Sequence, residues 1–239
     1  MPREQELLAV LIDADNIPAK YAEAILEEVK RYGEPALRQV YGDWSNDALN
    51  GWRKASRELG LVAKQETANT TGKNATDIGL VISAMDILHS GRFDGFVLVS
   101  SDSDFTALAN RLRENGVKVI GIGEEKTPNS LVKVCNRFVF LENIAAPSTG
   151  DKDVEKQGSP KKQPPSKVVP MVLRAMQSLD DEADWYNLSP LGRQINRENP
   201  AFDPRTYGST KLSELLTRTG QFEVRKGSGN GLQVRKKEN

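Results

Sequence analysis

Apolar residues in the first 144 positions of the chain fall into two alternating patterns. Short unbroken runs such as LLAVLID, GFVLVSS and VKVIGIG are typical of strands that are buried on both faces. Between these runs, apolar residues recur every three or four positions, as in the segment 76–88, which is typical of amphipathic helices. The regular alternation predicts an α/β fold with a mostly parallel sheet that is covered by helices on both faces.

The turn residues between these patterns bound the expected elements. Strands are expected at 7–13, 36–44, 61–67, 95–101, 117–123 and 137–144. Helices are expected at 18–32, 48–60, 76–88, 104–116 and 130–136.

The last third of the chain has a different pattern. Helices are expected at 168–178, 190–198 and 209–218, and Ser189 is expected to cap the second of these, with Pro190 at its first position. Two short alternating runs then flank a glycine-rich turn in QFEVRKGSGNGLQVRKK, which predicts a β-hairpin. Three helices followed by a basic hairpin have the outline of a winged helix.

Charge and composition separate these two parts of the chain. Positions 1–144 contain 17 Lys and Arg and 21 Asp and Glu, a net charge of −4, whereas positions 161–239 contain 14 and 9, a net charge of +5. The sequence between them, AAPSTGDKDVEKQGSPKKQPPSK, lacks the apolar residues needed to form a core. We therefore predict an acidic domain at 1–145, a linker at 146–166 and a basic domain at 167–239. The basic domain would hold a polyanion on which the acidic one acts, unless these charges are only solvated surface.

The composition excludes several kinds of catalytic site. With one histidine, His89, and one cysteine, Cys135, the chain cannot form a His-pair acid–base site, a zinc site of several His and Cys, or an intrachain disulfide. The start MPREQELLAVLID does not resemble a signal peptide, and no apolar run approaches the roughly 20 residues that cross a bilayer. We expect a cytoplasmic protein with no membrane partner, in which carboxylates carry any chemistry.

Aspartates stand where several predicted elements begin or end. Asp13 ends the first strand, Asp102 and Asp104 follow the strand GFVLVSS, and Asp77 opens the helix after the loop TTGKN. Because ligands of an open parallel sheet bind beyond the carboxyl ends of its strands, we expect these four acids to converge. Their mutual repulsion and hard oxygen donors favour Mg²⁺ or Mn²⁺. Taken singly, Asp102 or Asp104 could merely cap the next helix, and we expect Asp104 to do so in any case.

Three segments of this first part resemble a known family. VLIDADN, GKNATDIGLVISAMDIL and FDGFVLVSSDSDFTALANRLRENGVKVIGIGE are similar to the NYN domains of the PIN-like nuclease superfamily, over about residues 7–144. The resemblance implies a PIN-like, Rossmannoid α/β/α sheet and metal-dependent cleavage of the phosphodiester bonds of RNA. It also implies site residues: the metal ligands Asp13, Asp77, Asp102 and Asp104, and Asn16, which would orient a metal-bound water or the substrate.

One position departs from the pattern of this family. Close relatives often have an aspartate where this chain has Ser83. Asp86 does not replace that acid, because it follows Asp77 by nine residues and is about half a turn out of phase at roughly 100° per residue. We therefore expect weaker metal binding or slower cleavage. The missing acid also favours an alternative function, that of a non-catalytic RNA-binding adaptor.

The last part of the chain resembles the LOTUS domain, also called OST-HTH, a winged helix linked to RNA binding. The similar stretch is LSPLGRQINRENPAFDPRTYGSTKLSELLTRTGQFEVR, with the motif YG-x-x-K-L-x-x-L-L. The implied partner is RNA, single-stranded or structured, and a protein partner or a second copy of the chain could also dock on the winged helix. Basic side chains are expected to contact phosphates: Arg193, Lys211, Arg225 and Lys226. Tyr207 is expected to stack on a base, with core packing as the alternative.

Two residues of the first part are further candidates for RNA contacts. Lys73 lies beside the acids in TTGKNATD, at a spacing that does not fit a P-loop. Trp44 could stack on a base, with packing against the core as the alternative. The sequence as a whole predicts a divalent-metal-dependent ribonuclease with a basic RNA-recruiting domain. A phosphatase or nucleotide-binding enzyme on a similar sheet is a weaker alternative, because no phosphate-cradling loop is evident.

Overall fold

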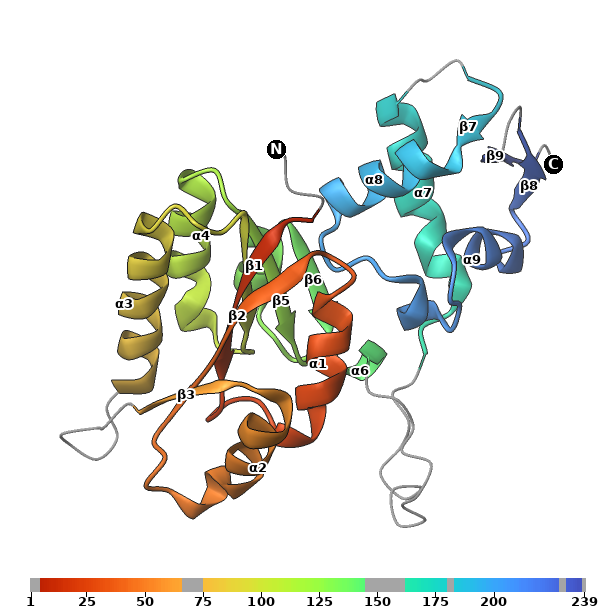
Figure 1. Cartoon of the computed structure of the whole chain (residues 1–239). Helices are drawn as coiled ribbons and strands as arrows, with labels where there is room; N and C mark the ends of the chain where they lie inside the picture. The colour runs from red at the N-terminus through yellow and green to blue at the C-terminus, as the bar shows by residue number, and fades with distance from the viewer. Residues whose placement is uncertain (1–4, 66–74, 145–161, 180–182, 228–230, 238–239) are drawn as a thin grey trace, which may run out of the picture. The chain divides into compact units, whose positions relative to one another are not determined.

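The computed structural model describes residues 5–65, 75–144, 162–179, 183–227 and 231–237. The chain divides into two compact units, Met1–Ser148 and Thr149–Asn239 (Figure 1). Within the described ranges, no helix is long and apolar enough to cross a membrane. Lys73 lies outside these ranges, so its place beside the acids stays a prediction.

The described part of the first unit is built on a six-stranded parallel sheet. Its strands are β1 (Leu7–Asp13), β2 (Glu34–Gly42), β3 (Val62–Gln65), β4 (Gly95–Val99), β5 (Lys118–Gly123) and β6 (Arg137–Phe140). They lie in the order β3-β2-β1-β4-β5-β6. This sheet confirms the PIN-like α/β fold that the sequence predicts.

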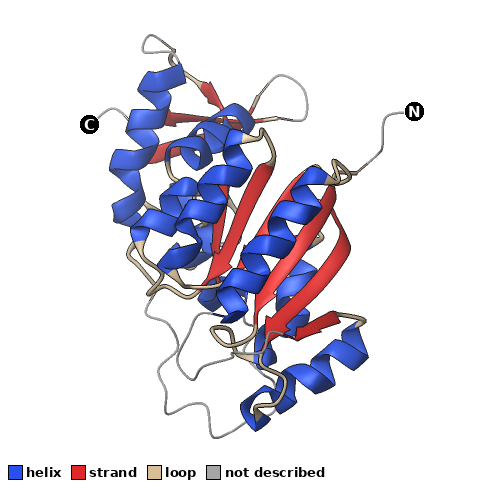
Figure 2. Cartoon of the chain, turned by 90° about the vertical axis from the view of Figure 1, so that its left-hand side faces the viewer, coloured by secondary structure: helices blue, strands red, loops and turns tan. Residues whose placement is uncertain are grey.

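Helices cover both faces of the sheet. They are α1 (Ala22–Val29), α2 (Asn50–Leu59), α3 (Ala75–His89), α4 (Thr106–Glu114), α5 (Asn129–Val134) and α6 (Leu141–Ile144). Alternate residues of β1, Leu8, Val10 and Ile12, are fully buried among side chains of α1 and α2. The other face carries α3 and α4 (Figure 1), and Figure 2 looks onto the side that α3 covers. Burial from both sides explains why the strands are unbroken apolar runs.

The strand order reverses between β1 and β4, because the chain continues from β1 to β2 on one side and from β4 to β5 on the other. β1 and β4 run in parallel register, with Val10 beside Val97 and Ile12 beside Val99. Their carboxyl ends therefore finish side by side. In open α/β sheets, ligands bind in the crevice at such a reversal.

The expected elements differ from the observed ones mainly at their ends. The segment 137–144 is expected to be one strand, but β6 ends at Phe140 and Leu141–Ile144 forms the short helix α6. The carboxylate of Glu142 in α6 accepts a hydrogen bond of 2.9 Å from the backbone N–H of Glu125, a contact with a distant segment that no local pattern encodes. In the described part of the first unit, short 3-10 turns precede three helices: η1 (Ala19–Tyr21), η2 (Asp47–Leu49) and η3 (Ser103–Phe105).

The second unit combines helices with a small antiparallel sheet of order β7-β9-β8. Its described elements are η5 (Pro165–Val168), α7 (Val169–Leu179), β7 (Tyr186–Asn187), α8 (Leu188–Glu198), η6 (Pro204–Tyr207), α9 (Leu212–Arg218), β8 (Phe222–Lys226) and β9 (Leu232–Lys236). A core of its own includes Val172, Leu191, Leu215 and Phe222. The unit has the winged-helix outline that the sequence predicts, although the hairpin turn at 228–230 lies outside the described residues.

Two details of this unit correct the sequence prediction. Helix α8 begins at Leu188 with Asn187 at its N-cap, so Ser189 and Pro190 lie inside the first turn rather than at the cap and the first position. Proline is tolerated there because the first N–H groups of a helix have no intrahelical partner. Strand β7 is not predicted, since two residues are too short to show an alternating pattern.

Candidate active site

Asp13, the last residue of β1, is buried with only 2% of its surface exposed. The hydroxyl of Ser100 donates a hydrogen bond of 2.8 Å to its Oδ2. The backbone N–H groups of Asp15 and Asn16 donate to its Oδ1 at 3.2 and 3.3 Å. The carboxylate is thus held in one orientation from both of its oxygens.

Ser100, the first residue after β4, links Asp13 to the next acid along this edge of the sheet. Its hydroxyl oxygen accepts a hydrogen bond of 3.1 Å from the backbone N–H of Asp102. Asp102 caps η3, because its Oδ1 accepts a 2.9 Å hydrogen bond from the N–H of Asp104. From the sequence we expect Asp104 to cap, but the cap is Asp102. Asp104 is exposed in the first turn of η3.

Asp77 enters the site from the first turn of α3, which places it near the other acids. Desolvation raises its pKa, and the carboxylates of Asp102, Asp104 and Asp15 raise it further. Burial also raises the pKa of Asp13, from 3.8 to about 6, against the opposing hydrogen bond from Ser100 and with added repulsion from Asp77 and Asp15. The four predicted acids and Asp15 therefore act on one another electrostatically. We call these five residues the acid cluster: Asp13, Asp15, Asp77, Asp102 and Asp104.

Asp15 is the member of the acid cluster that the sequence analysis missed. Its Oδ2 accepts a hydrogen bond of 2.8 Å from the hydroxyl of Thr76, which joins the loop after β1 to the start of α3. Asp13 and Asp15 have the same two-residue spacing as Asp102 and Asp104, so the repeated pattern D-x-D at a strand end is a signal that could have found it. Asn16 is half-buried next to it, and the role of its side chain stays a prediction.

The donor chemistry of the acid cluster fits a divalent cation. Carboxylate oxygens are the ligands that Mg²⁺ and Mn²⁺ prefer. Desolvation is the main cause of the raised pKa values of Asp13 and Asp77, and a cation would offset both this cost and the added repulsion between the carboxylates. As placed, however, no three His, Cys, Asp or Glu side chains of the described residues are grouped closely enough to hold a metal ion. Side-chain rotation within the cluster would be needed to bring ligands together.

Ser83, the position that the sequence analysis singled out as a departure from the family pattern, faces β2. The hydroxyl of Tyr41 donates to its Oγ at 2.7 Å, and Ser83 Oγ lies 3.3 Å from Oε1 of Gln39. Tyr41 pairs with Asp13 in the parallel ladder of β1 and β2, so Ser83 contacts the strand next to the one that ends at Asp13. Asp86 is exposed farther along α3.

The described candidates for RNA contacts have different surroundings. Trp44 follows β2 and is half-buried, with its Nε1 donating to the carbonyl of Lys64 at 2.7 Å. Tyr207 is only 9% exposed and lies in the core of the second unit, where its ring centre is 6.2 Å from that of Phe202. This burial favours the alternative of core packing for Tyr207, and base stacking by this residue stays a prediction. The basic candidates are exposed on the second unit: Arg193, Lys211, Arg225 and Lys226.

Trp185, just before β7, is an aromatic residue that the sequence analysis did not select. The guanidinium carbon of Arg225 lies 3.7 Å from the centre of its indole ring, and that of Arg235 lies 4.7 Å from it. Arg225 on β8 and Arg235 on β9 lie on one face of the small sheet, since Arg225 pairs with Gln233, two residues before Arg235. We call Trp185, Arg225 and Arg235 the wing face. Only the antiparallel register brings these residues together.

Two family models match the chain. The family model of the NYN domain matches residues 7–142, and that of the OST-HTH/LOTUS domain matches residues 161–234. The chain is similar to a protein of unknown function from Vibrio parahaemolyticus, with 22% identity and a TM-score of 0.49, over 58% of this chain and 94% of that one. It is also similar to an uncharacterized protein of Nitrosomonas europaea, with 30% identity and a TM-score of 0.28, over 40% of this chain and 93% of that one.

No curated protein matches the chain. The NYN match spans more than half of the 239 residues and contains β1, β4 and every member of the acid cluster. The OST-HTH/LOTUS match contains the wing face except Arg235, which lies one residue beyond it. The chain therefore belongs to the NYN domain family, and its NYN domain is followed by an OST-HTH/LOTUS domain.

Proposed function

We propose that this protein is a divalent-metal-dependent ribonuclease whose acid cluster cleaves phosphodiester bonds of RNA. The observation that carries the proposal is Asp13, a buried carboxylate beside other acids at the reversal of strand order. Burial and like charge make such a residue unfavourable for the stability of the fold, and acids of this kind concentrate at functional sites. The NYN family belongs to the PIN-like nuclease superfamily, which supports the same activity.

The residues of the acid cluster would have distinct parts in this activity. Asp13, Asp77 and Asp102 would bind Mg²⁺ or Mn²⁺, with Asp104 at the exposed rim. When bound, the cation would activate a water molecule and stabilise the leaving oxygen. Ser100 would hold the Asp13 carboxylate in its binding orientation through the 2.8 Å hydrogen bond. Because the pKa of Asp13 is about 6, its carboxylate is mainly ionised at neutral pH and able to bind a cation.

RNA would be recruited mainly by the C-terminal unit. Positions 161–239 carry the net charge of +5, while the catalytic unit is acidic and repels a polyanion. Exposed basic residues of this unit can replace the counterions of phosphates: Arg193, Lys211 and Lys226. The wing face adds an aromatic ring with two guanidinium groups, a combination that suits stacking on bases and contact with phosphates.

A second candidate function is that of an RNA-binding adaptor with little or no cleavage. It is favoured by Ser83, which lies in a hydrogen-bonded group with Tyr41 and Gln39 instead of supplying an acid. It is also favoured by the spread of the acid cluster, in which no three of the described acids are grouped as ligands. In this case the acidic unit would contribute little to RNA affinity.

The cellular setting also remains a proposal. The one cysteine, Cys135, is free and buried, and burial raises the pKa of its thiol to about 12, so it is poorly reactive. A protein with one buried thiol and no disulfide is in keeping with a cytoplasmic location. A protein partner or a second copy on the winged helix stays a prediction.

Cleavage of labelled single-stranded RNA in Mg²⁺, in Mn²⁺ and in EDTA tests the proposed function. Shorter products in either metal and none in EDTA are expected. RNA that is bound but intact under all three conditions would instead favour the adaptor.

A further inference from the structure

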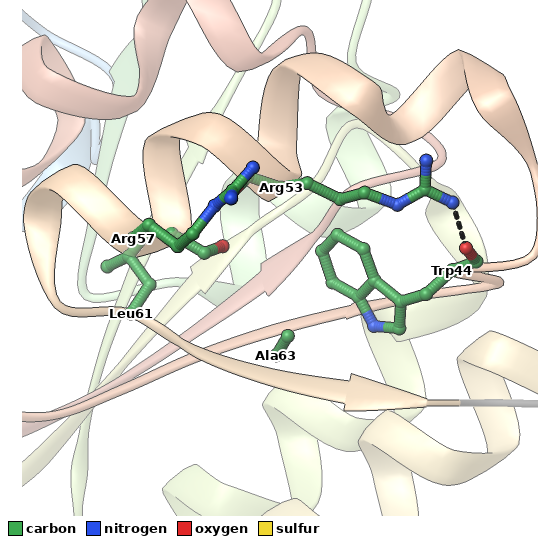
Figure 3. Close-up of a pocket in the computed structure, with 6 residues that line it drawn as sticks. Trp44, Arg53, Arg57, Leu61 and Ala63 are labelled. Carbon is green, nitrogen blue, oxygen red and sulfur yellow. Dashed lines mark hydrogen bonds between the residues drawn. The ribbon is translucent and has the colours of Figure 1, made fainter.

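A hollow on the first unit lies between α2 and β3 (Figure 3). It has a volume of about 580 Å³, which is within the range of small-molecule sites, roughly 300–1,000 Å³. The lining residues are Trp44, Arg53, Ser56, Arg57, Leu61 and Ala63. The hollow thus combines an aromatic ring, two guanidinium groups and a hydroxyl with apolar walls.

Ser56 on α2 is the most unusual of these lining residues. Its side chain is 6% exposed, and its hydroxyl oxygen is buried without a hydrogen-bond partner among the described residues. An unpaired buried polar group lowers the stability of a fold, by about 1–3 kcal/mol in typical cases. Rotation of the Ser56 side chain toward the hollow would let a ligand there supply the missing partner.

The two arginines of the hollow differ in their availability. Arg53 donates hydrogen bonds to the backbone carbonyl of Trp44 and to the side chain of Asn50, so it is engaged in holding the segment that carries the indole. Figure 3 shows the Arg53 side chain reaching over to Trp44, with Arg57 and Leu61 at the other end of the hollow. Arg57 makes one hydrogen bond in the described structure, from Nε to the carbonyl of Arg53 at 3.2 Å. Its terminal N–H groups are available for an anion.

The hollow lies near the same edge of the sheet as the acid cluster. Trp44 stands two residues after Gly42, the last residue of β2. A Cβ atom placed on Gly42 would lie 3.7 Å from Oδ1 of Asp15, so the end of β2 is adjacent to the cluster. A strand of RNA bound in the hollow could therefore pass over the end of β2 toward Asp13.

We infer that this hollow binds one nucleotide of the RNA strand, at a position separate from the bond that is cut. The indole of Trp44 would stack on the base, the terminal N–H groups of Arg57 would bind the phosphate, and Ser56 would hydrogen-bond to the ribose or phosphate. RNA is the occupant that matches both the exposed guanidinium and the aromatic ring. The inference rests on the proposed binding of RNA, but not on cleavage.

The test uses the full chain with Asp102→Asn, in EDTA, so that RNA is bound and not cut. Single-stranded RNA containing 4-thiouridine is photo-crosslinked to the protein, and crosslinked peptides are identified by mass spectrometry. A crosslink to the peptide that contains Trp44 is expected. Arg57→Gln should lower the yield of the Trp44 crosslink about tenfold when RNA is limiting, because the substitution removes a charge-assisted hydrogen bond to the phosphate. Lys54→Gln is the matched control, since it removes an exposed positive charge from the same helix outside the hollow lining.

Ser56→Ala gives an independent measurement. It should raise the Tm of the free protein, because the unpaired hydroxyl is removed, and yet lower the yield of the Trp44 crosslink. A merely structural serine would not produce these opposite changes. An unchanged crosslink in Ser56→Ala would exclude the hydroxyl from the site.

The outcomes separate the two proposals. The hollow is not a nucleotide site if RNA crosslinks only elsewhere on the chain, or if Arg57→Gln and Lys54→Gln give the same yield of the Trp44 crosslink. Either result would favour a protein partner as the occupant of the hollow. If RNA crosslinks to no part of the chain, the proposed function itself fails.

Discussion

The hydroxyl of Ser100 donates a 2.8 Å hydrogen bond to Oδ2 of Asp13, although the two residues are 87 positions apart in the chain. The bond joins the ends of β1 and β4, the two strands between which the strand order reverses. It also orients the most buried acid of the acid cluster and opposes the rise in its pKa. Binding of a cation at this site requires that the Asp13 carboxylate be held in this orientation.

The buried charge of Asp13 should be visible in the stability of the metal-free protein. Its pKa is raised from 3.8 to about 6, so the folded state binds the proton more tightly than the unfolded chain. Stability should therefore fall as the pH rises from about 4 to about 7. Asp13→Asn should remove this loss and stabilise the metal-free protein at neutral pH by up to about 3 kcal/mol, at about 1.4 kcal/mol per pKa unit.

Urea unfolding in EDTA at several pH values measures this effect, with the exposed Asp86→Asn on α3 as control. Asp13→Asn should also abolish cleavage while the protein stays folded. Equal stability of Asp13→Asn and the parent across this pH range would mean that the buried charge of Asp13 does not destabilise the fold. Cleavage by Asp13→Asn at the rate of the parent would exclude Asp13 from the metal site.

Ser100→Ala should act through Asp13. Without the hydrogen bond that lowers it, the pKa of Asp13 should rise further, so metal binding and cleavage should require a higher pH. The rate near pH 6 should fall more than the rate near pH 8. The neighbouring Ser101→Ala is a suitable control, because the Ser101 hydroxyl accepts from the N–H of Glu124 instead. A uniform loss of rate at every pH would point to a structural defect and not to the titration of Asp13.

Ser83→Asp should add an acid to a half-buried position between Tyr41 and Gln39. Desolvation of the new carboxylate should lower the Tm of the metal-free protein, and bound Mn²⁺ should raise the Tm more than in the parent. Metal binding should tighten and cleavage should accelerate. Ser83→Asn, similar in size but uncharged, should do neither. A metal titration that gives the same response for Ser83→Asp and Ser83→Asn would show that position 83 does not reach the cation.

The wing face should contribute to RNA affinity. Trp185→Ala should weaken binding of single-stranded RNA about tenfold, since stacking of a base on an aromatic ring contributes about 1–3 kcal/mol. Trp185→Phe should retain part of the affinity, whereas Arg225→Gln should also reduce the dependence of binding on salt. Anisotropy titrations in EDTA at low and moderate salt measure both effects. Full affinity in Trp185→Ala would assign RNA recruitment to another surface.

Much of the fold follows from local patterns in the sequence. The apolar runs mark β1 and β4 because strands buried on both faces contain few polar residues. Asp13 and Asp102 could be assigned to one edge of the sheet, since carboxyl ends of neighbouring parallel strands finish together. Their convergence and oxygen donors predict a cation site, and the resemblance to a family implies the same residues as its ligands.

The remaining features depend on contacts between distant residues. Asp15 joins the acid cluster because the hydroxyl of Thr76 reaches it from α3, and Trp185 meets Arg225 only through the register of a small antiparallel sheet. Tyr207 is an aromatic residue in a stretch linked to RNA binding, which suggested stacking on a base, but its ring lies in the core beside Phe202. Sequence periodicity indicates which side of an element is apolar, but not which partner covers it.

Asp102→Asn is the sharpest test of the proposed metal site. Asparagine is as good an N-cap as aspartate, so the substitution keeps the hydrogen bond to the N–H of Asp104 and removes only the charge. The measurement is cleavage of end-labelled single-stranded RNA by parent and variant in Mn²⁺, Mg²⁺ and EDTA, with RNA binding measured in parallel. We predict that the parent cleaves RNA in Mn²⁺ or Mg²⁺ but not in EDTA. The cleavage rate of Asp102→Asn should be lower by at least about a hundredfold, while both proteins bind RNA equally well. Equal cleavage by the parent and Asp102→Asn, or undiminished cleavage in EDTA, would contradict a metal-dependent nuclease site in this acid cluster.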